Sequence, residues 1–346
     1  MLHINNIQIT RPDDWHVHLR EGELLQCVIN STTRVTGKCI VMPNTATPIT
    51  NSFLCKHYKK EILKLTKVSY FKPYIPCYLT DDIDLKDFQL SLKDNLFVGA
   101  KLYPAHTTTN STYGVTTIEK IFPALEMLVE YKKPLLIHGE KIAEDINLFD
   151  REKYFIDDEL IRIVNEFPSL KIILEHVSSK YGVDFVMQNS HLAGTITPHH
   201  MLLTKKDVFQ KNIYGHHYCM PIVKEEEDLL ALRKCACSGN EKFFIGTDSA
   251  PHEIKHKENT KNIKPGIFSA PCSIELYTDI FDQENSLHNL EKFTSINGSK
   301  FYGLSINQEK IELIKKQWKV EEYTVYNNIK VKNFYGGEKL NWKIES

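Results

Sequence analysis

The chain has 346 residues, 42% of them hydrophobic and 25% charged, which is an ordinary composition for a globular protein with a large core. Its 43 basic and 44 acidic residues give a net charge of −1, so no global charge points to nucleic acid or to an acidic membrane surface. No run of about 18 apolar residues is present, and the opening MLHINNIQIT lacks the basic-then-apolar order of a signal peptide. We therefore expect a cytoplasmic protein with no nucleic-acid or membrane partner.

The cysteines agree with that compartment. The chain has eight, and the only close pair, Cys235 and Cys237, is spaced C-x-C and not C-x-x-C. No zinc-ribbon spacing occurs, and a cytosolic chain of this length does not need a disulfide framework. We predict that all eight are reduced packing residues.

Short β-rich runs recur along the first 250 residues, each about as long as a typical strand. Several are almost continuously apolar, as in a parallel sheet covered on both faces. Charged stretches with helical spacing separate them, at 52–67, 117–131, 157–166 and 224–238. Eight such βαβ units predict an α/β fold, a (β/α)8 TIM barrel. An open doubly wound sheet is the alternative, weakened because no G-x-G-x-x-G follows the first run. The runs are DWHVHL (14–19), CIVMPN (39–44), YIPCYL (74–79), VGAKLYP (98–104), PLLIHGE (134–140), KIILEHV (171–177), GTITPHH (194–200) and FFIGTDSA (243–250).

The region from about Ser273 onward departs from this rhythm. SINGSKFYGL (295–304) is typical of a turn and a helix end, and TVYNNIKVKNFYGG (324–337) is typical of a strand-like tail. We expect a single domain over residues 1–346, with the barrel core at about 1–272 and a C-terminal capping extension at 273–346.

Polar side chains sit mostly in the C-terminal halves of the eight runs. Barrel enzymes place their active sites at that end of the strands. We therefore expect one pocket to collect the polar residues of these runs, namely His16, His18, Asn44, Lys101, His138, His176 and Asp248.

The histidines suggest a metal centre, since imidazole suits zinc and similar divalent ions. His16, His18 and Arg20 stand two residues apart, so on a strand they would share one face. That pattern fits either a polar sheet edge or a metal pair beside an anion clamp. A histidine that closes an apolar strand is often only a hydrogen-bonded core residue, but His138 and His176 occupy matching strand ends, which favours ligation.

Asp248 and Lys101 have competing interpretations. Asp248, in IGTDSAPH, could cap the next helix, or bind metal and shuttle a proton. Lys101 lies inside an apolar strand, where an ammonium must be paired or neutral. It could form an ion pair with Asp248, form a Schiff base with a carbonyl substrate, or add carbon dioxide to become a carbamate whose two oxygens bridge two metal ions.

The remaining paired histidines lie near the predicted mouth. His199 and His200 are adjacent, as are His216 and His217. We expect both pairs to line the pocket without touching metal.

The motifs together resemble those of the dihydroorotases, in the amidohydrolase superfamily. HVHLR around Arg20 matches the H-x-H-x-R signature of that family. The agreement covers roughly residues 8 to 305 and is most like the shorter, bacterial-type (class II) members, which are homodimers. The other matching motifs, in order, are VMPN, AKLYPA, LLIHGE, LEHVSS, HHYCMPI and GTDSAPH.

The resemblance implies a metal centre of two zinc ions. It makes His16 and His18, with Asp248, ligands of the more buried ion. It makes His138 and His176 ligands of the second ion. Lys101, as N6-carboxylysine, would bridge both ions together with a hydroxide.

The resemblance also implies a substrate site. Arg20 and Asn44 would hold the substrate carboxylate with help from His252, and His18 and His138 would border the substrate. The main chain at Met220 and Pro265 would contact the substrate ring, although the loop 255–269 departs from the family pattern. The remaining positions are Thr108 and Thr109, on a mobile loop that closes over the substrate.

The implied activity is the reversible cyclisation of N-carbamoyl-L-aspartate to L-dihydroorotate in pyrimidine biosynthesis, with Asp248 as general base and then acid. The alternatives are another cyclic amidohydrolase, such as a hydantoinase or allantoinase, and a non-catalytic barrel that scaffolds a pyrimidine-pathway partner. A Schiff-base aldolase-type barrel would leave four histidines without a role.

Overall fold

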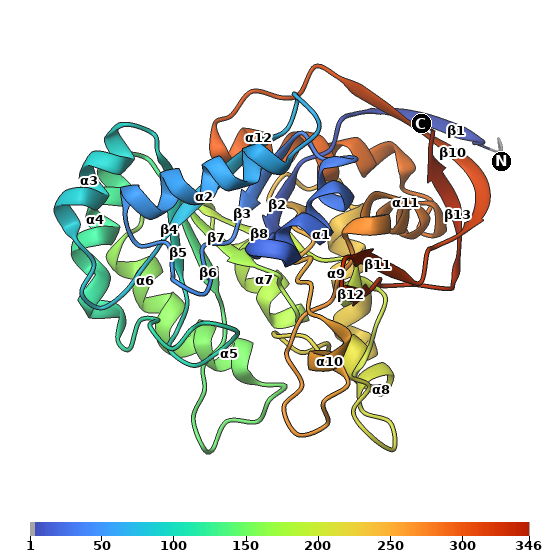
Figure 1. The fold of residues 1–346 in the computed structure, drawn as a ribbon. Coiled ribbons are helices and arrows are strands. Elements are labelled where there is room, and N and C mark those ends of the chain that lie inside the picture. The colour runs from blue at the N-terminus through green and yellow to red at the C-terminus, as the bar shows by residue number, and fades with distance from the viewer. Residues whose placement is uncertain (1–3, 346) are drawn as a thin grey trace.

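Eight parallel strands form the centre of the protein in a computed structural model that describes residues 4–345. The strands pair in chain order from β2 to β9, and helices surround them (Figure 1). The predicted (β/α)8 barrel is confirmed. Its strands are β2 (Asp14–Val17), β3 (Lys38–Val41), β4 (Lys72–Tyr78), β5 (Phe97–Leu102), β6 (Leu135–His138), β7 (Ile172–Glu175), β8 (Leu192–Ile196) and β9 (Phe243–Ile245).

Several strands end earlier than the runs that predicted them. β2 ends at Val17 and β9 ends at Ile245, so His18 and Asp248 lie in the loops that follow. We expected His16, His18 and Arg20 to share one strand face, but only His16 lies within β2. Arg20 has a φ of 60°, in the left-handed region, where the chain turns away from the strand direction.

The first and last strands meet at the seam that closes the barrel. The backbone N–H of Asp248 donates to the carbonyl of His16 at 2.9 Å, and that of His18 donates to the carbonyl of Ser249 at 3.0 Å. The carboxylate of Asp14 accepts hydrogen bonds from the hydroxyl of Thr247 at 2.6 Å and from its backbone N–H at 2.9 Å. The seam therefore fixes the loops after β2 and β9 against each other.

The neighbouring residue, Asp13, holds the N-terminal end of β2. The Asp13 carboxylate accepts from the backbone N–H of Lys38 at 2.9 Å, from Ser299 at 2.9 Å and from Asn307 at 2.8 Å. Trp15, which is fully buried, stacks on Tyr302 with ring centroids 4.7 Å apart. These residues anchor β2 to the C-terminal part of the chain.

The helices of the barrel agree with the four stretches predicted from spacing, with shifts at their ends. In α2, for example, the Asn51 side chain caps the first turn, and Cys55, Tyr58 and Ile62 face the barrel. The helices are α1 (Gly22–Thr33), α2 (Ser52–Leu65), α3 (Leu85–Lys93), α4 (Phe122–Glu130), α5 (Arg151–Phe155), α6 (Ile161–Glu166), α7 (Lys180–Gln188), α8 (Lys205–Val208), α9 (Glu226–Cys237), α10 (Ile254–Lys257), α11 (Ser273–Gln283) and α12 (Asn297–Tyr302).

Shorter helical turns complete the outer layer. A π-helical turn joins α5 to α6, and another leads into α12, which is followed by Gly303 with a φ of 67°. The other turns are of the 3-10 type. The π turns are Ile156–Leu160 and Lys292–Ile296, and the 3-10 turns are Ile118–Ile121, His199–Met201, Gly215–His217, Ala270–Cys272 and Leu287–Asn289.

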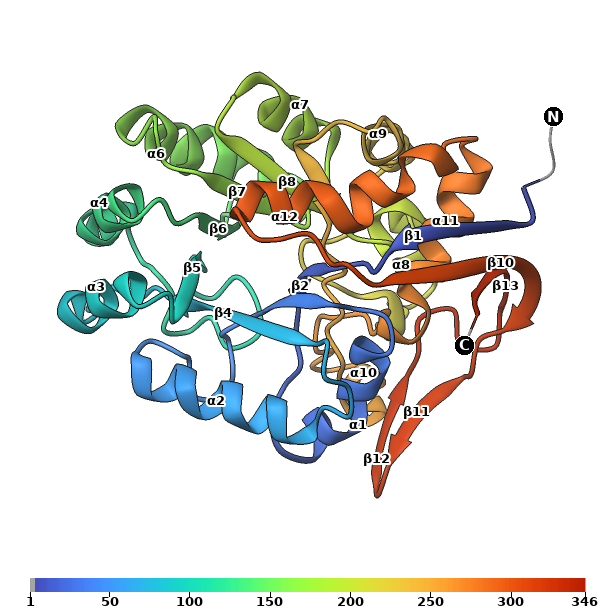
Figure 2. The same cartoon turned by 90° about the horizontal axis from the view of Figure 1, so that it is seen from above.

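The two ends of the chain form a sheet that the sequence did not predict. β1 (Asn6–Thr10) and β13 (Lys339–Ile344) flank β10 (Lys310–Lys319), all antiparallel, on one side of the barrel (Figure 2). The predicted strand-like tail is a hairpin of β11 (Tyr323–Tyr326) and β12 (Ile329–Lys332), which packs near α1.

None of the helices in residues 4–345 is long and apolar enough to cross a bilayer. All eight cysteines are free and buried, as predicted. The first three residues of the opening MLHINNIQIT lie outside the described residues.

The seam gives a test of barrel closure. Thr247→Val removes the hydroxyl that donates to Asp14, a carboxyl whose pKa burial already raises to about 6. Because a buried acceptor then loses its partner, we expect the free energy of unfolding to fall by about 1–3 kcal/mol in denaturant titrations. Thr116→Val is the matched control, since it removes the same kind of bond to Asp81 at an exposed position. Its effect should stay within about 0.5 kcal/mol, and equal losses in the two variants would contradict the role of the seam.

Candidate active site

A small pocket opens at the C-terminal ends of the strands, where the sequence placed its polar residues. Its walls come from the ends of β2, β3, β5, β6 and β7 and from the loops that follow β8 and β9. Its lining consists of His16, His18, Arg20, Asn44, Tyr103, Thr108, Thr109, His138, His176, Met220, Asp248, Ala250, Pro265 and Gly266.

Two histidines and an aspartate form the first cluster in this pocket. The Nε2 atoms of His16 and His18 lie 3.3 Å apart and point to the same carboxylate oxygen of Asp248, at 3.3 and 3.0 Å. All three side chains are almost fully buried, and their donor atoms lie within 4.8 Å of one another. Convergence of two imidazole nitrogens and a carboxylate on one point is a donor set that suits zinc.

The second cluster surrounds Lys101, which is fully buried beneath the pocket. Its Nζ contacts the carboxylate of Glu175 and lies 4.8 Å from the centroid of the Tyr103 ring. Nearby, Nδ1 of His138 lies 3.1 Å from Nε2 of His176. The His176 ring is 5.0 Å from that of His16, so the two clusters are in contact.

Burial decides the charge of these groups. It lowers the pKa of His18 to about 3, and it also lowers the pKa values of His16, His138 and His176. Burial likewise lowers the pKa of Lys101 well below its ordinary value. The lowered pKa values favour the neutral forms of these groups, whose lone pairs are what a metal ion or an electrophile needs.

Asp248 remains the acidic member of the site. Burial opposes its ionisation, but hydrogen bonds from His16 and His18 outweigh that effect and hold its pKa well below the ordinary value. Asp248 has a φ of 45° and His176 a φ of 43°, both in the left-handed region. Backbone of this kind is costly and concentrates at functional sites.

A guanidinium borders the other side of the pocket. Arg20 Nε donates to the carbonyl of Pro251 at 3.1 Å, and Nη2 lies 3.1 Å from Nε2 of His252. The same ring nitrogen of His252 lies 2.9 Å from the carbonyl of Pro265. His252 thus joins Arg20 to the loop after β9, and the planar fork of an arginine suits a carboxylate.

The loop that carries Thr108 and Thr109 lies over Asn44. The Asn44 amide donates to the carbonyl of Thr109 at 3.0 Å, and the Asn110 amide donates back to the carbonyl of Asn44 at 2.9 Å. The loop is thereby held against the pocket by polar contacts.

The structure therefore brings nearly all of the predicted site residues to one pocket. Lys101 lies below it and His252 lies behind Arg20. The sequence missed Tyr103, which follows Lys101 by two residues, and Glu175, which precedes His176. Both residues lie inside motifs that were quoted from the sequence. Tyr103 is two residues beyond Lys101, which is the spacing of one strand face, and Glu175 is adjacent to His176, so these two relations could have identified them.

The two histidine pairs depart from expectation. Neither His199 and His200 nor His216 and His217 are among the residues that line this pocket. His199 and His200 are buried beside it, and His216 and His217 border a separate hollow next to Phe334.

Comparison with known proteins gives a consistent family. Residues 80–320 match the model of the amidohydrolase family. The chain is similar to the dihydroorotase of Photorhabdus laumondii, with 40% identity over 98% of this chain and 97% of that one. It is also similar to the dihydroorotase of Vibrio vulnificus, with 42% identity over 99% of this chain and 100% of the other.

Solved structures give the same family. A Saccharomyces cerevisiae dihydroorotase in complex with 5-fluoroorotic acid is similar with a TM-score of 0.93 and 30% identity, over 99% of both chains. A Campylobacter jejuni dihydroorotase has a TM-score of 0.91 and 33% identity, over 100% of this chain and 99% of that one. An Arthrobacter aurescens L-hydantoinase (dihydropyrimidinase) shares the fold, with a TM-score of 0.81 and 16% identity over 97% and 82% of the two chains.

Proposed function

Because this chain belongs to the amidohydrolase family and, within it, to the dihydroorotases, we propose that it interconverts N-carbamoyl-L-aspartate and L-dihydroorotate at a centre of two zinc ions. Ring closure forms an amide bond and releases water, a step in the making of UMP. One observation carries the proposal: a single pocket joins the imidazole and carboxylate donors to the guanidinium of Arg20. Turnover of dihydroorotate, measured together with metal content by elemental analysis, tests it.

The donors in the pocket fit the proposed ions. His16, His18 and Asp248 would hold one ion, and their donor atoms already lie within 4.8 Å of one another. His138 and His176, whose facing nitrogens are 3.1 Å apart, would hold the second. Nδ1 of His176 has no hydrogen-bond partner among residues 4–345, which is an unusual state for a buried polar atom.

Lys101 would complete the centre as N6-carboxylysine. Four neutral imidazoles leave two dications short of negative charge, and a carbamate supplies an anion with two oxygens. Burial lowers the pKa of the Lys101 amine well below its ordinary value, which favours the neutral form that adds carbon dioxide, whereas contact with the Glu175 carboxylate favours the ammonium that the carbamate would replace. Bound divalent ions would acidify water and polarise the carbonyl that is attacked.

The chain's own residues would bind the substrate and move the proton. Arg20 offers two parallel N–H groups to the substrate carboxylate, with Asn44 and His252 beside it. His18 and His138 border the substrate, and the main chain at Met220 and Pro265 faces its ring. Asp248, ionised beside two neutral imidazoles, takes the proton of the attacking water and delivers it to the departing ring nitrogen.

The alternative functions fit the pocket less well. A hydantoinase or allantoinase shares the metal donors but does not need a carboxylate clamp such as Arg20, and the similar hydantoinase shares the fold alone at 16% identity. A non-catalytic scaffold would be expected to have lost a ligand, and a Schiff-base enzyme would leave the histidines unused.

The proposal extends to organisation and location. We place residues 1–272 as the barrel core and 273–346 as its capping extension within one domain. Helix α11 begins at that boundary and is tied to β13, because Asp279 accepts hydrogen bonds from the backbone of Asn341 and Trp342 at 3.1 Å. A homodimer in the cytoplasm follows from the resemblance to the class II members, and the eight free cysteines agree with that compartment.

The clamp is tested by Arg20→Lys, which keeps the charge but loses the two-point fork. We expect substrate binding to weaken by about 1.5–3 kcal/mol, the range for hydrogen bonds to charged groups, seen as a raised KM. Metal content should not change. Arg162→Lys is the control at an exposed site. If Arg20→Lys bound substrate like the wild type, Arg20 would not be part of the clamp.

The loop is tested by replacing both Thr108 and Thr109 with alanine. A lid adds contacts and excludes water only when substrate is present, so turnover should fall while metal content and thermal stability are kept. Thr324→Ala, in the hairpin of β11, is the control. Unaltered turnover would show that the loop plays no part in the reaction.

The bridge is tested at Lys101. Lys101→Ala should lose at least one metal ion and nearly all activity, and small carboxylic acids should restore part of both by supplying two oxygens. Native mass spectrometry should find the wild type heavier by one carbon dioxide, lost after acid denaturation. Lys224→Met, at another buried lysine, should keep both ions. A bare ammonium beside two occupied metal sites would refute the carbamate.

A further inference from the structure

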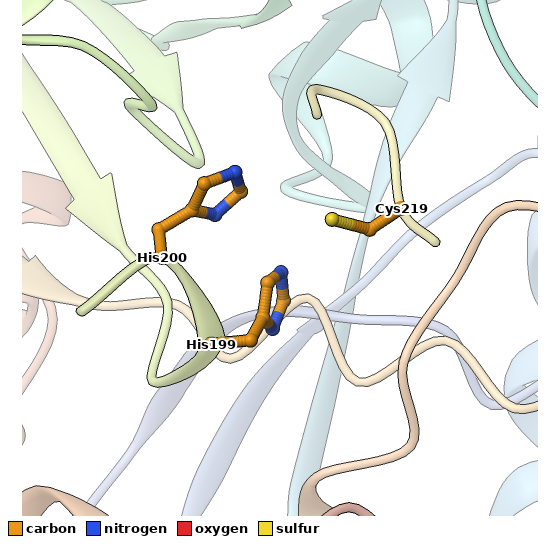
Figure 3. A group of neighbouring side chains, drawn as sticks. All are labelled: His199, His200 and Cys219. Atoms are coloured by element: carbon orange, nitrogen blue, oxygen red, sulfur yellow. The ribbon is translucent and has the colours of Figure 1, made fainter. Parts of the chain in front are cut away.

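A second group of metal-binding side chains lies outside the pocket. His199, His200 and Cys219 place their donor atoms within 4.8 Å of one another. The histidines stand in the 3-10 turn that follows β8, and Cys219 comes from the segment across from them, with its sulfur pointing toward both rings (Figure 3). All three are buried, with exposures of 0%, 2% and 0%. Two imidazoles and a thiol are a donor set for zinc and other thiophilic ions.

His200 is held in the tautomer that ligation needs. Its Nε2 lies 3.0 Å from the carbonyl of Pro221, which can only accept, so Nε2 carries the proton. Nδ1 is therefore the nitrogen with the free lone pair, and it accepts from the hydroxyl of Thr197 at 2.7 Å. Metal-bound histidines typically donate their other N–H to a carbonyl or a carboxylate in this way. The Thr197 oxygen occupies the direction of that lone pair, so an ion reaches Nδ1 only when the Thr197 side chain turns about its Cα–Cβ bond and withdraws the oxygen.

His199 supplies the independent observation. Neither of its ring nitrogens has a hydrogen-bond partner within the part of the chain that the structure describes. Buried polar groups are nearly always paired, so a fully buried imidazole with two unpaired nitrogens requires an explanation. One nitrogen of this ring faces the space between His200 and Cys219 (Figure 3), where an ion would satisfy it.

Cys219 completes the set. Its thiol donates to the carbonyl of Pro221 at 3.3 Å, the same carbonyl that orients His200. An incoming dication displaces the thiol proton to solvent and binds the thiolate, so the site would carry a net charge of one positive unit. Burial lowers the pKa of His199 to about 4, which keeps that ring neutral and its lone pair available.

We propose that His199, His200 and Cys219 form a third metal site of this chain, for a thiophilic divalent ion of the zinc type, separate from the proposed catalytic pair. The fourth position is left to water. The earlier expectation that the histidine pair avoids metal, and that Cys219 only packs, is replaced by this proposal. An ion here joins the end of β8 to the residue before Met220, which lines the catalytic pocket.

The sulfur ligand allows metal binding at this site to be distinguished from metal binding at the catalytic site. The proposed catalytic ligands contain no thiolate, so thiolate-to-cobalt charge-transfer absorption in the near ultraviolet reports only on a cysteine-containing site. Co²⁺ is added to the purified holoenzyme and the band is titrated. We expect a saturable band of one equivalent per chain in the wild type. The result does not depend on whether the protein turns over dihydroorotate, so the two proposals can fail independently.

The variants identify the ligands. Cys219→Ser should abolish the band, while Cys55→Ser, at an equally buried thiol in α2, should leave it unchanged. His199→Leu should weaken Co²⁺ binding by about tenfold or more. Without added metal this variant should be no less stable than the wild type, since an unpaired polar ring is replaced by an apolar side chain. It should also lose the rise in Tm that Co²⁺ gives the wild type.

Three results would overturn the proposal. These are no band in the wild type at saturating Co²⁺, a band that persists in folded Cys219→Ser, and an unchanged affinity in His199→Leu. If Cys219→Ser does not fold, the Co²⁺ affinity and the Tm of His199→Leu decide whether the proposed site exists.

Discussion

The pairing of the first barrel strand with the last is the constraint on which the rest of the site depends. His16 and Asp248 are far apart in the sequence, yet a backbone hydrogen bond of 2.9 Å joins them directly. The Asp14 carboxylate locks the same seam by accepting two bonds from Thr247. Closure of the barrel thus places the donor atoms before any ligand arrives, which is the preorganisation that tight metal binding requires.

That geometry is maintained at an electrostatic cost. The mouth of the barrel buries Lys101, the four imidazoles and the carboxylates of Asp14, Glu175 and Asp248 in one region with little access to water. Burial lowers the pKa values of the imidazoles and of the Lys101 amine, and the Glu175 carboxylate lies against that amine, so the interior avoids uncompensated cations. The neutral forms that burial favours are also the forms that bind metal and attack an electrophile. Stability of the fold and readiness for metal are therefore two consequences of the same burial.

Much of this arrangement could be predicted from sequence, because the informative signals are local. An apolar run that ends in histidine or aspartate marks both a parallel strand and its functional end, as at His138 and Asp248. The missing parts are non-local. β1 pairs with β10 from the other end of the chain, in the register Asn6 to Ile314, and no local pattern encodes that partner. Glu175 looked like an ordinary neighbour of a ligand until the barrel placed Lys101 against it.

The histidines after β8 show where the strand-end rule stops being sufficient. His199 and His200 follow a barrel strand just as His138 and His176 do, but they do not line the catalytic pocket. What distinguishes them is the environment of their ring nitrogens. A carbonyl of a distant loop fixes the tautomer of His200, and nothing within residues 4–345 pairs with His199. Position along the strand places an imidazole near the mouth of the barrel, but the contacts of its two nitrogens decide what it can bind.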